Sequence, residues 1–126
     1  MRSYRGHVKI WLLALGAFII SLLGIFIVVK AENTGQLTFI NDGFYKVIKG
    51  EIEVCGQKLT FENLEPGGKR SWNFKITVDS HYHVSLHLKS GETVVKDVGY
   101  VTNGFDFQDT IVLRKTEVLL AEHKVY

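Results

Sequence analysis

The sequence has a single cysteine among its 126 residues, so an intramolecular disulfide is excluded. It also lacks the motifs of common catalytic sites: there is no G-x-S-x-G nucleophile elbow, no phosphate-binding glycine loop and no H-E-x-x-H metal motif. No motif places a histidine beside Cys55, and we expect a buried thiol or, alternatively, an intermolecular disulfide. These absences predict a protein that is not an enzyme and that needs no cofactor.

Basic residues are sparse outside the N-terminal region. Four of the fifteen lysines and arginines lie in the first thirty residues, where there is no acidic residue at all. Residues 31–126 therefore carry eleven bases against thirteen acids, a net charge of −2. Because binding to phosphate backbones needs a concentrated basic surface, this balance argues against a nucleic-acid partner.

One long hydrophobic run is present. Residues 10–29 contain no charge and are bracketed by Lys9 and Lys30. Twenty residues at about 1.5 Å each form roughly 30 Å of helix, which matches the hydrocarbon core of a bilayer. Trp11 stands where an interfacial aromatic residue is expected. We therefore predict one transmembrane helix over residues 10–29.

The charges around this run predict its orientation. Arg2, Arg5 and Lys9 precede it, whereas Lys30 is offset by Glu32 after it. The positive-inside bias then places the N-terminus in the cytoplasm and the remainder outside the cytoplasmic membrane of a bacterial envelope. The resulting organisation is a cytoplasmic tail at 1–9, the span at 10–29, a linker at 30–35 and a periplasmic or otherwise extracytoplasmic domain at 36–126.

A cleaved signal peptide is the alternative reading of the N-terminus. The residues "VKA" at 29–31 place small side chains where cleavage after Ala31 requires them, although the apolar run is longer than the usual signal core. Either reading places the domain outside the cytoplasm. Within the span, small residues recur on one face and form a candidate packing surface for another helix: Ala14, Ala17, Ser21 and Gly24.

Beyond the linker, the pattern changes to a period of two, which is typical of β-strands with one buried face. Residues 71–78 alternate Trp, Phe, Ile and Val with polar side chains, and residues 81–89 alternate Tyr, Val and Leu with His and Ser. Further strands are predicted at 36–40, around 50–54, and at 58–61, 93–101 and 110–114. The C-terminal stretch 116–126 reads as a final strand or as a strand followed by a frayed tail.

Turn-forming sequences separate these runs at intervals of about 8 to 12 residues, which is typical of an all-β sandwich or small barrel. The turns are NDG at 41–43, CGQ at 55–57, EPGG at 65–68, KSGE at 89–92 and TNG at 102–104. The predicted core contains Leu37, Phe39, Ile52, Val54, Leu59, Phe61, Trp72, Phe74, Ile76, Val78, Tyr82, Val84, Leu86, Leu88, Val98, Tyr100, Ile111 and Leu113.

Two short motifs within residues 36–114 carry a resemblance. The first is an L-x-P-G turn, and the second is a G-Y-V-T-x-G segment before the last strand; their residues are Leu64, Pro66, Gly67, Gly99, Tyr100, Val101, Thr102 and Gly104. With them the chain resembles small membrane-anchored bacterial proteins that have an immunoglobulin-like extracytoplasmic domain. The resemblance implies an immunoglobulin-like sandwich after one transmembrane helix, and it implies no particular activity.

Three of the five histidines, His81, His83 and His87, lie on one side of the predicted strand 81–89. Because a His-x-His pair on a strand can bind zinc or copper, these residues are candidate metal ligands. The neighbouring strand is expected to place Lys75 beside them, where its positive charge opposes metal binding. The sequence therefore favours a solvent-facing row of histidines without a bound metal.

The loop TNGFDFQD at 102–109 places aromatic residues beside an acid between two strands. Phe105, Asp106 and Phe107 are therefore candidates for a partner-binding patch. The alternative is that one or both phenylalanines fill the end of the sandwich.

These observations predict a non-enzymatic, membrane-anchored interaction module, an accessory or scaffold subunit of a cell-envelope complex. Its partner would be another protein, in a membrane complex or as a homodimer. A second hypothesis is an envelope immunity or inhibitor protein that binds a toxin or hydrolase, and a third is a periplasmic metal-handling domain that uses the histidine row.

Overall fold

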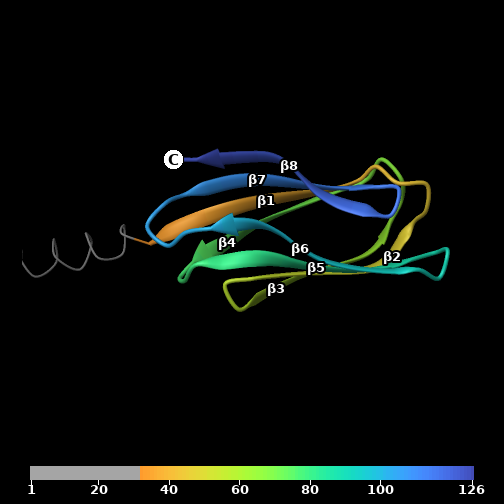
Figure 1. Cartoon of the computed structure of the whole chain (residues 1–126), viewed down its shortest axis with the longest axis horizontal. Coiled ribbons are helices and arrows are strands. Elements are labelled where there is room, and N and C mark those ends of the chain that lie inside the picture. The colour runs from red at the N-terminus through yellow and green to blue at the C-terminus, as the bar shows by residue number, and fades with distance from the viewer. Residues whose placement is uncertain (1–31) are drawn as a thin grey trace, which may run out of the picture. The chain divides into compact units, whose positions relative to one another are not determined.

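Eight β-strands and no helix form the part of the chain that the structure describes, residues 32–126 (Figure 1). The structure is a computed structural model. The strands are β1 (Asn33–Asn41), β2 (Val47–Val54), β3 (Gln57–Leu64), β4 (Lys69–Ile76), β5 (Ser80–Leu88), β6 (Thr93–Val101), β7 (Phe107–Arg114) and β8 (Glu117–Val125).

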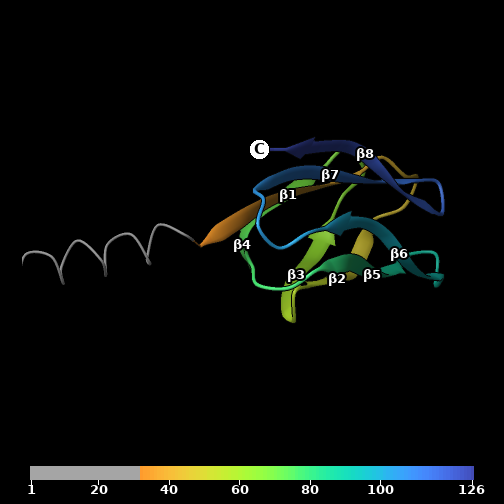
Figure 2. The same ribbon diagram turned by 60° about the vertical axis from the view of Figure 1, so that its left-hand side comes forward.

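The strands form two four-stranded sheets that lie face to face (Figure 2). One sheet has the order β4-β1-β7-β8 and the other has the order β3-β2-β5-β6. Neighbouring strands are antiparallel except β1 and β7, which are parallel. The predicted all-β sandwich is thus confirmed, and 116–126 forms a full final strand rather than a frayed tail.

The sandwich of two packed sheets is consistent with an immunoglobulin-like architecture. Here β1 pairs with β4 and β7, and β2 lies in the opposite sheet with β3 and β5. The chain therefore crosses between the sheets directly after β1.

Side chains from both sheets fill the space between them, as the two-residue period predicts. In β5 the even-numbered residues Tyr82, Val84, Leu86 and Leu88 are buried, and the histidines point to the other face. All of the predicted core residues are buried except three: Val78 and Tyr100 are exposed, and Trp72 is half-buried against the core, where its ring lies 5.7 Å from Phe61.

Two local departures from regular strand geometry explain the two wrong core predictions. Val78 lies in the turn after Ile76, where the alternation no longer fixes the side of a residue. Gly99 has a left-handed φ of 63°, and the β5–β6 register shifts beside it. This β-bulge moves Tyr100 to the surface and turns Val101 into the core.

The expected burial of Cys55 is confirmed, whereas several other buried apolar residues were missing from the predicted core: Val47, Leu64, Val101, Phe107, Val112 and Val118. Leu64 follows Asn63, whose φ of 52° interrupts the alternation of β3 in the same way as Gly99 does in β6. Two glycines are required by the packing of aromatic rings: a Cβ on Gly35 or Gly50 would lie 2.2 Å from the ring of Phe74 or Phe61.

The N-terminal predictions fall largely outside the described residues. This holds for the tail at 1–9, the span at 10–29, the cleavage site after Ala31 and the small-residue face. Within residues 32–126, no helix is long and apolar enough to cross a bilayer. Strand β1 begins at Asn33, inside the stretch predicted as linker, because it pairs with Ile76 of β4 from that residue onward.

The domain has two ends with different loops. Asn33, the turns at 55–56, 77–79 and 102–106, and the C-terminus lie at one end, which we call the proximal end (Figure 1). The connections at 42–46, 65–68, 89–92 and 115–116 lie at the other, which we call the distal end. Any tether formed by the residues before Asn33 therefore joins the domain at its proximal end.

Candidate functional site

The three strand histidines lie on the outer face of β5, but each contacts a different group of β6. The contacts are His81 Nδ1 to Gly99 O at 3.0 Å, His83 Nδ1 to Asp97 Oδ1 at 2.5 Å, and His87 Nδ1 to Thr93 Oγ1 at 3.2 Å. Among residues 32–126, no group of three or more His, Cys, Asp or Glu side chains is arranged to hold a metal ion. The histidines therefore act as separate cross-strand contacts in this structure.

The expected neighbour of this row, Lys75, is not there. Lys75 lies on β4, in the opposite sheet, whereas β5 lies between β2 and β6. The two strands follow one another along the chain, but the turn between them passes from one sheet to the other. His83 instead has Glu53 opposite it on β2 and Asp97 on β6.

The predicted partner patch in the loop after β6 is divided by the fold. Phe107 is buried as the first residue of β7, and its ring lies 5.5 Å from that of His123. Asp106 accepts a hydrogen bond from the Thr34 amide at 2.9 Å, which holds the loop against the start of β1. Only Phe105 of the candidate trio is both aromatic and exposed.

Cys55 is buried at the two-residue turn between β2 and β3. Both turn residues have positive φ, 49° at Cys55 and 70° at Gly56, as a type I′ hairpin requires. The Cys55 amide donates to Ser80 Oγ at 3.0 Å, and its thiol lies 3.2 Å from the Val78 carbonyl oxygen. The thiol is turned inward by this turn, and it braces the β4–β5 connection.

A polar chain that the sequence did not indicate crosses the core near the proximal end. Asp109, only 1% exposed, accepts a 2.6 Å hydrogen bond from the Tyr82 hydroxyl, and its other oxygen lies 2.6 Å from His123 Nδ1. Burial raises the pKa of the Tyr82 phenol well above its ordinary value, and the bond to the carboxylate adds to the shift. The chain joins β5 of one sheet to β7 and β8 of the other.

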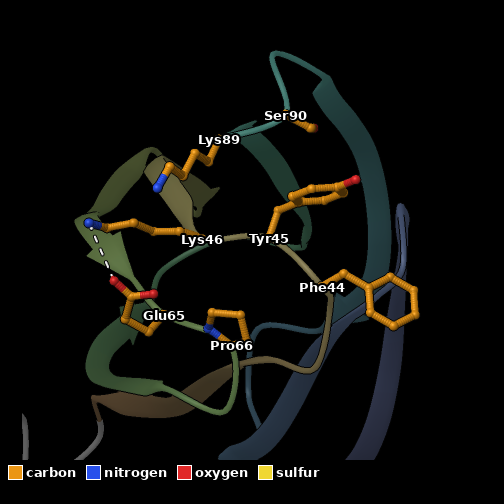
Figure 3. A pocket seen from close by; sticks show the side chains of 7 residues that line it. All are labelled: Phe44, Tyr45, Lys46, Glu65, Pro66, Lys89 and Ser90. Carbon is orange, nitrogen blue, oxygen red and sulfur yellow. Dashed lines mark ion pairs between the residues drawn. The ribbon is translucent and has the colours of Figure 1, made fainter.

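A pocket with a volume of about 490 Å³ lies at the distal end (Figure 3). Three connections that are distant in sequence line it: the β1–β2 loop, the β3–β4 turn and the β5–β6 turn. The lining residues are Phe44, Tyr45, Lys46, Glu65, Pro66, Lys89 and Ser90.

Large apolar surface is exposed around this pocket. Phe44 is 75% exposed and Tyr45 is 48% exposed, and the two are consecutive in the β1–β2 loop. Burying an aromatic side chain removes 150–250 Å² from water, a typical range for Phe and Tyr, so exposing two together is costly unless a partner covers them. Phe44 and Tyr45 therefore form a candidate contact surface at the distal end.

The buried side chain of Asn41, which is 0% exposed, holds the loop that carries these aromatic residues. The Asn41 side-chain amide donates to the carbonyl oxygens of Tyr45 and Leu64, both at 2.9 Å, and its oxygen accepts from the Gly43 amide at 3.0 Å. These three bonds use both donor hydrogens and the oxygen of one side chain. Asn41 thereby fixes the aromatic loop to the end of β3.

Backbone hydrogen bonds connect all three lining connections. The backbone amide of Gly67 donates to the carbonyl oxygen of Asn41 at 2.6 Å, and the backbone amide of Asn41 donates to the carbonyl oxygen of Gly68 at 3.0 Å. The Lys89 amide donates to the Lys46 carbonyl at 2.9 Å, which ties the β5–β6 turn to the β1–β2 loop. The pocket is therefore preformed by main-chain contacts and does not depend on its exposed side chains.

No protein-family model matches the sequence, and no curated protein is significantly similar to it. Among solved structures, the chain is similar to one titled "NMR structure of the protein from Eubacterium rectale". The sequences are 17% identical, the alignment covers 72% of this chain and 87% of that chain, and the TM-score is 0.49. The site therefore has to be interpreted from its own chemistry.

The exposure of Phe44 and Tyr45 could have been predicted from the sequence. The turn NDG at 41–43 is followed directly by two aromatic residues, and a turn leaves few neighbours to bury them. The role of Asn41 could not be predicted from the sequence, because it depends on a hydrogen bond to the carbonyl oxygen of Leu64 in another strand, β3. The pairing of Lys46 with Lys89 likewise follows from the sheet order.

Proposed function

We propose that the protein is a non-enzymatic, membrane-anchored interaction module that contacts a protein partner through its distal end. It would serve as an accessory or scaffold subunit of a cell-envelope complex. The observation that carries this proposal is the pair of exposed aromatic residues, Phe44 and Tyr45, on a loop fixed by the buried Asn41.

Exposed aromatic residues on a loop that is already fixed are typical of protein–protein interfaces. Aromatic side chains dominate the residues whose truncation weakens binding, and they are most effective where little conformational freedom is lost. A loop already held by three side-chain hydrogen bonds loses little backbone entropy on binding. Binding residues are commonly carried by loops on a rigid β scaffold.

The location proposed from the sequence is compatible with this use of the distal end. Residues 10–29 would anchor the chain in the cytoplasmic membrane with the N-terminus inside, and the chain enters the domain at Asn33. We also propose that the domain is an immunoglobulin-like sandwich, a fold that presents binding loops at its ends.

Co-purification of the full-length protein from native membranes in mild detergent tests the proposal. Phe44→Ala combined with Tyr45→Ala should remove the partner without unfolding the domain, because both side chains are exposed. Phe105→Ala, an exposed aromatic residue at the proximal end, is the matched control and should keep it.

Loss of the partner with Phe105→Ala but not with the double variant would contradict the proposal. Ala17→Leu combined with Gly24→Leu tests the anchor separately. If only this variant releases the partner, the contact lies in the membrane span and the distal end has another role.

A further inference from the structure

The distal pocket carries two lysines whose charges the domain compensates only in part. Lys46 and Lys89 are joined by a backbone hydrogen bond, so they lie side by side where β2 begins and β5 ends. Like charges directly opposite each other on paired strands are destabilising. The carboxylate of Glu65 lies 3.4 Å from Lys46 Nζ, whereas Lys89 forms no ion pair with any described residue.

The pocket also has an apolar side. In Figure 3 the side chains of Lys46 and Lys89 extend to one side, and the rings of Tyr45 and Phe44 lie on the other, with Pro66 at the base between them. A ligand in this pocket would therefore meet two ammonium groups and the Glu65 carboxylate, a net charge of +1, at one end and aromatic or proline surface at the other. This is an amphipathic site with a fixed direction.

The dimensions suit a short piece of extended chain. Small-ligand pockets have volumes of about 300–1,000 Å³, and this one has about 490 Å³. Extended chain advances about 3.3–3.6 Å per residue, so a volume of about 490 Å³ corresponds to a short segment of it. The main-chain contacts of the three connections keep this spacing constant before a ligand arrives.

We propose that this pocket binds an extended, acidic peptide segment of the partner, with a carboxylate held by Lys89 and Lys46 and a neighbouring apolar side chain on Tyr45 and Pro66. This inference rests on the proposed function and adds the chemistry of the ligand. A carboxylate between the two ammonium groups offsets their mutual repulsion and forms charge-assisted hydrogen bonds.

The chemistry of the pocket favours a peptide over an anionic membrane surface. The pocket is concave, whereas a flat bilayer contacts protruding side chains.

The test uses the full-length chain in zwitterionic nanodiscs and three labelled peptides of equal length, in which Leu alternates with Glu, with Gln or with Lys. We expect the Glu peptide to bind roughly tenfold or more tightly than the Gln peptide, and the Lys peptide not to bind. Rising salt should weaken the binding, because the lysines are at the surface.

Lys89→Glu should reduce the affinity for the Glu peptide roughly tenfold or more, and it should leave the fold intact because Lys89 holds no ion pair among residues 32–126. Lys124→Glu, an exposed lysine on β8 toward the proximal end, is the matched control and should bind as the natural chain does. Equal affinity for the Glu and Gln peptides, or full binding by Lys89→Glu, would overturn the inference. Binding to anionic vesicles in place of the peptides would overturn it in favour of a membrane surface.

Its failure can be told apart from failure of the proposed function. If Phe44→Ala with Tyr45→Ala abolishes co-purification and Lys89→Glu does not, the distal contact stands and the acidic ligand is wrong. If neither change affects co-purification, the distal end is not the contact surface.

Discussion

Replacing Asn41 with alanine tests whether one buried side chain fixes the aromatic loop. The substitution removes the amide that donates to the carbonyl oxygens of Tyr45 and Leu64, and the oxygen that accepts from the Gly43 amide. The main-chain bonds of residue 41 to Gly67 and Gly68 remain. The change is therefore confined to the support of the loop.

The cost can be estimated from these contacts. A typical internal hydrogen bond contributes about 0.5–1.5 kcal/mol, so three bonds contribute about 3 kcal/mol. The Leu64 carbonyl is buried, and leaving it without a partner increases the loss. We expect the free energy of unfolding to fall by about 3–4 kcal/mol, a large part of the 5–15 kcal/mol typical of a domain.

Urea unfolding of the full-length chain in detergent, followed by the circular dichroism of its sheets, measures this loss. Asn73→Ala provides the control, because Asn73 is exposed on β4 and its loss should change the stability by about 0.5 kcal/mol or less. If Asn41→Ala costs no more than Asn73→Ala, the loop is not held by this side chain and the argument for a preformed contact surface fails.

An isosteric change separates the hydrogen bonds from the space that the side chain fills. Asn41→Asp keeps the size and the acceptor for Gly43, but it places an oxygen against the carbonyl oxygens of Tyr45 and Leu64. We expect it to destabilise the domain at neutral pH at least as much as alanine does. A stability equal to that of the natural chain would contradict the role of the amide hydrogens in holding the loop.

Three further predictions concern other parts of the domain. Above about pH 10 the free energy of unfolding should fall, because Tyr82 ionises in the unfolded chain while burial raises its pKa in the fold; Tyr82→Phe should remove that part of the fall, and an unchanged alkaline profile would contradict the buried phenol. Cys55 should react with a thiol reagent far more slowly in the native domain than in urea, and equal rates would show that the thiol is accessible. Calorimetry should give equally weak Zn²⁺ binding for the natural chain and for His81→Ala with His83→Ala, and tight binding lost in the double variant would establish a metal site.

The sequence predicts the faces of regular strands well, because the two-residue period directly reflects which side is buried. Tyr82, Val84, Leu86 and Leu88 of β5 follow this rule throughout. The rule fails where one residue adopts a left-handed φ, because the alternation then restarts on the other side. Gly99 shows this failure, and no composition signal distinguishes its bulge from an ordinary strand glycine.

The candidate site was less predictable than the fold, because it depends on which strands become neighbours. The sequence predicted a partner-binding patch at Phe105, Asp106 and Phe107, where an acidic residue lies between two aromatic residues. Folding buried Phe107 and engaged Asp106, since β7 begins earlier than its apolar run suggests. The pocket combines three connections whose proximity follows only from the sheet order.

Photocrosslinking in native membranes tests directly whether the distal end contacts a protein partner. A photoreactive phenylalanine analogue is placed at position 44 in one protein and at position 105 in another, which puts matched exposed probes at the distal and proximal ends. If the distal end is the contact surface, position 44 forms a crosslinked protein product identifiable by mass spectrometry, and position 105 does not. A product from position 105 alone would contradict the assignment of the distal end as the contact surface.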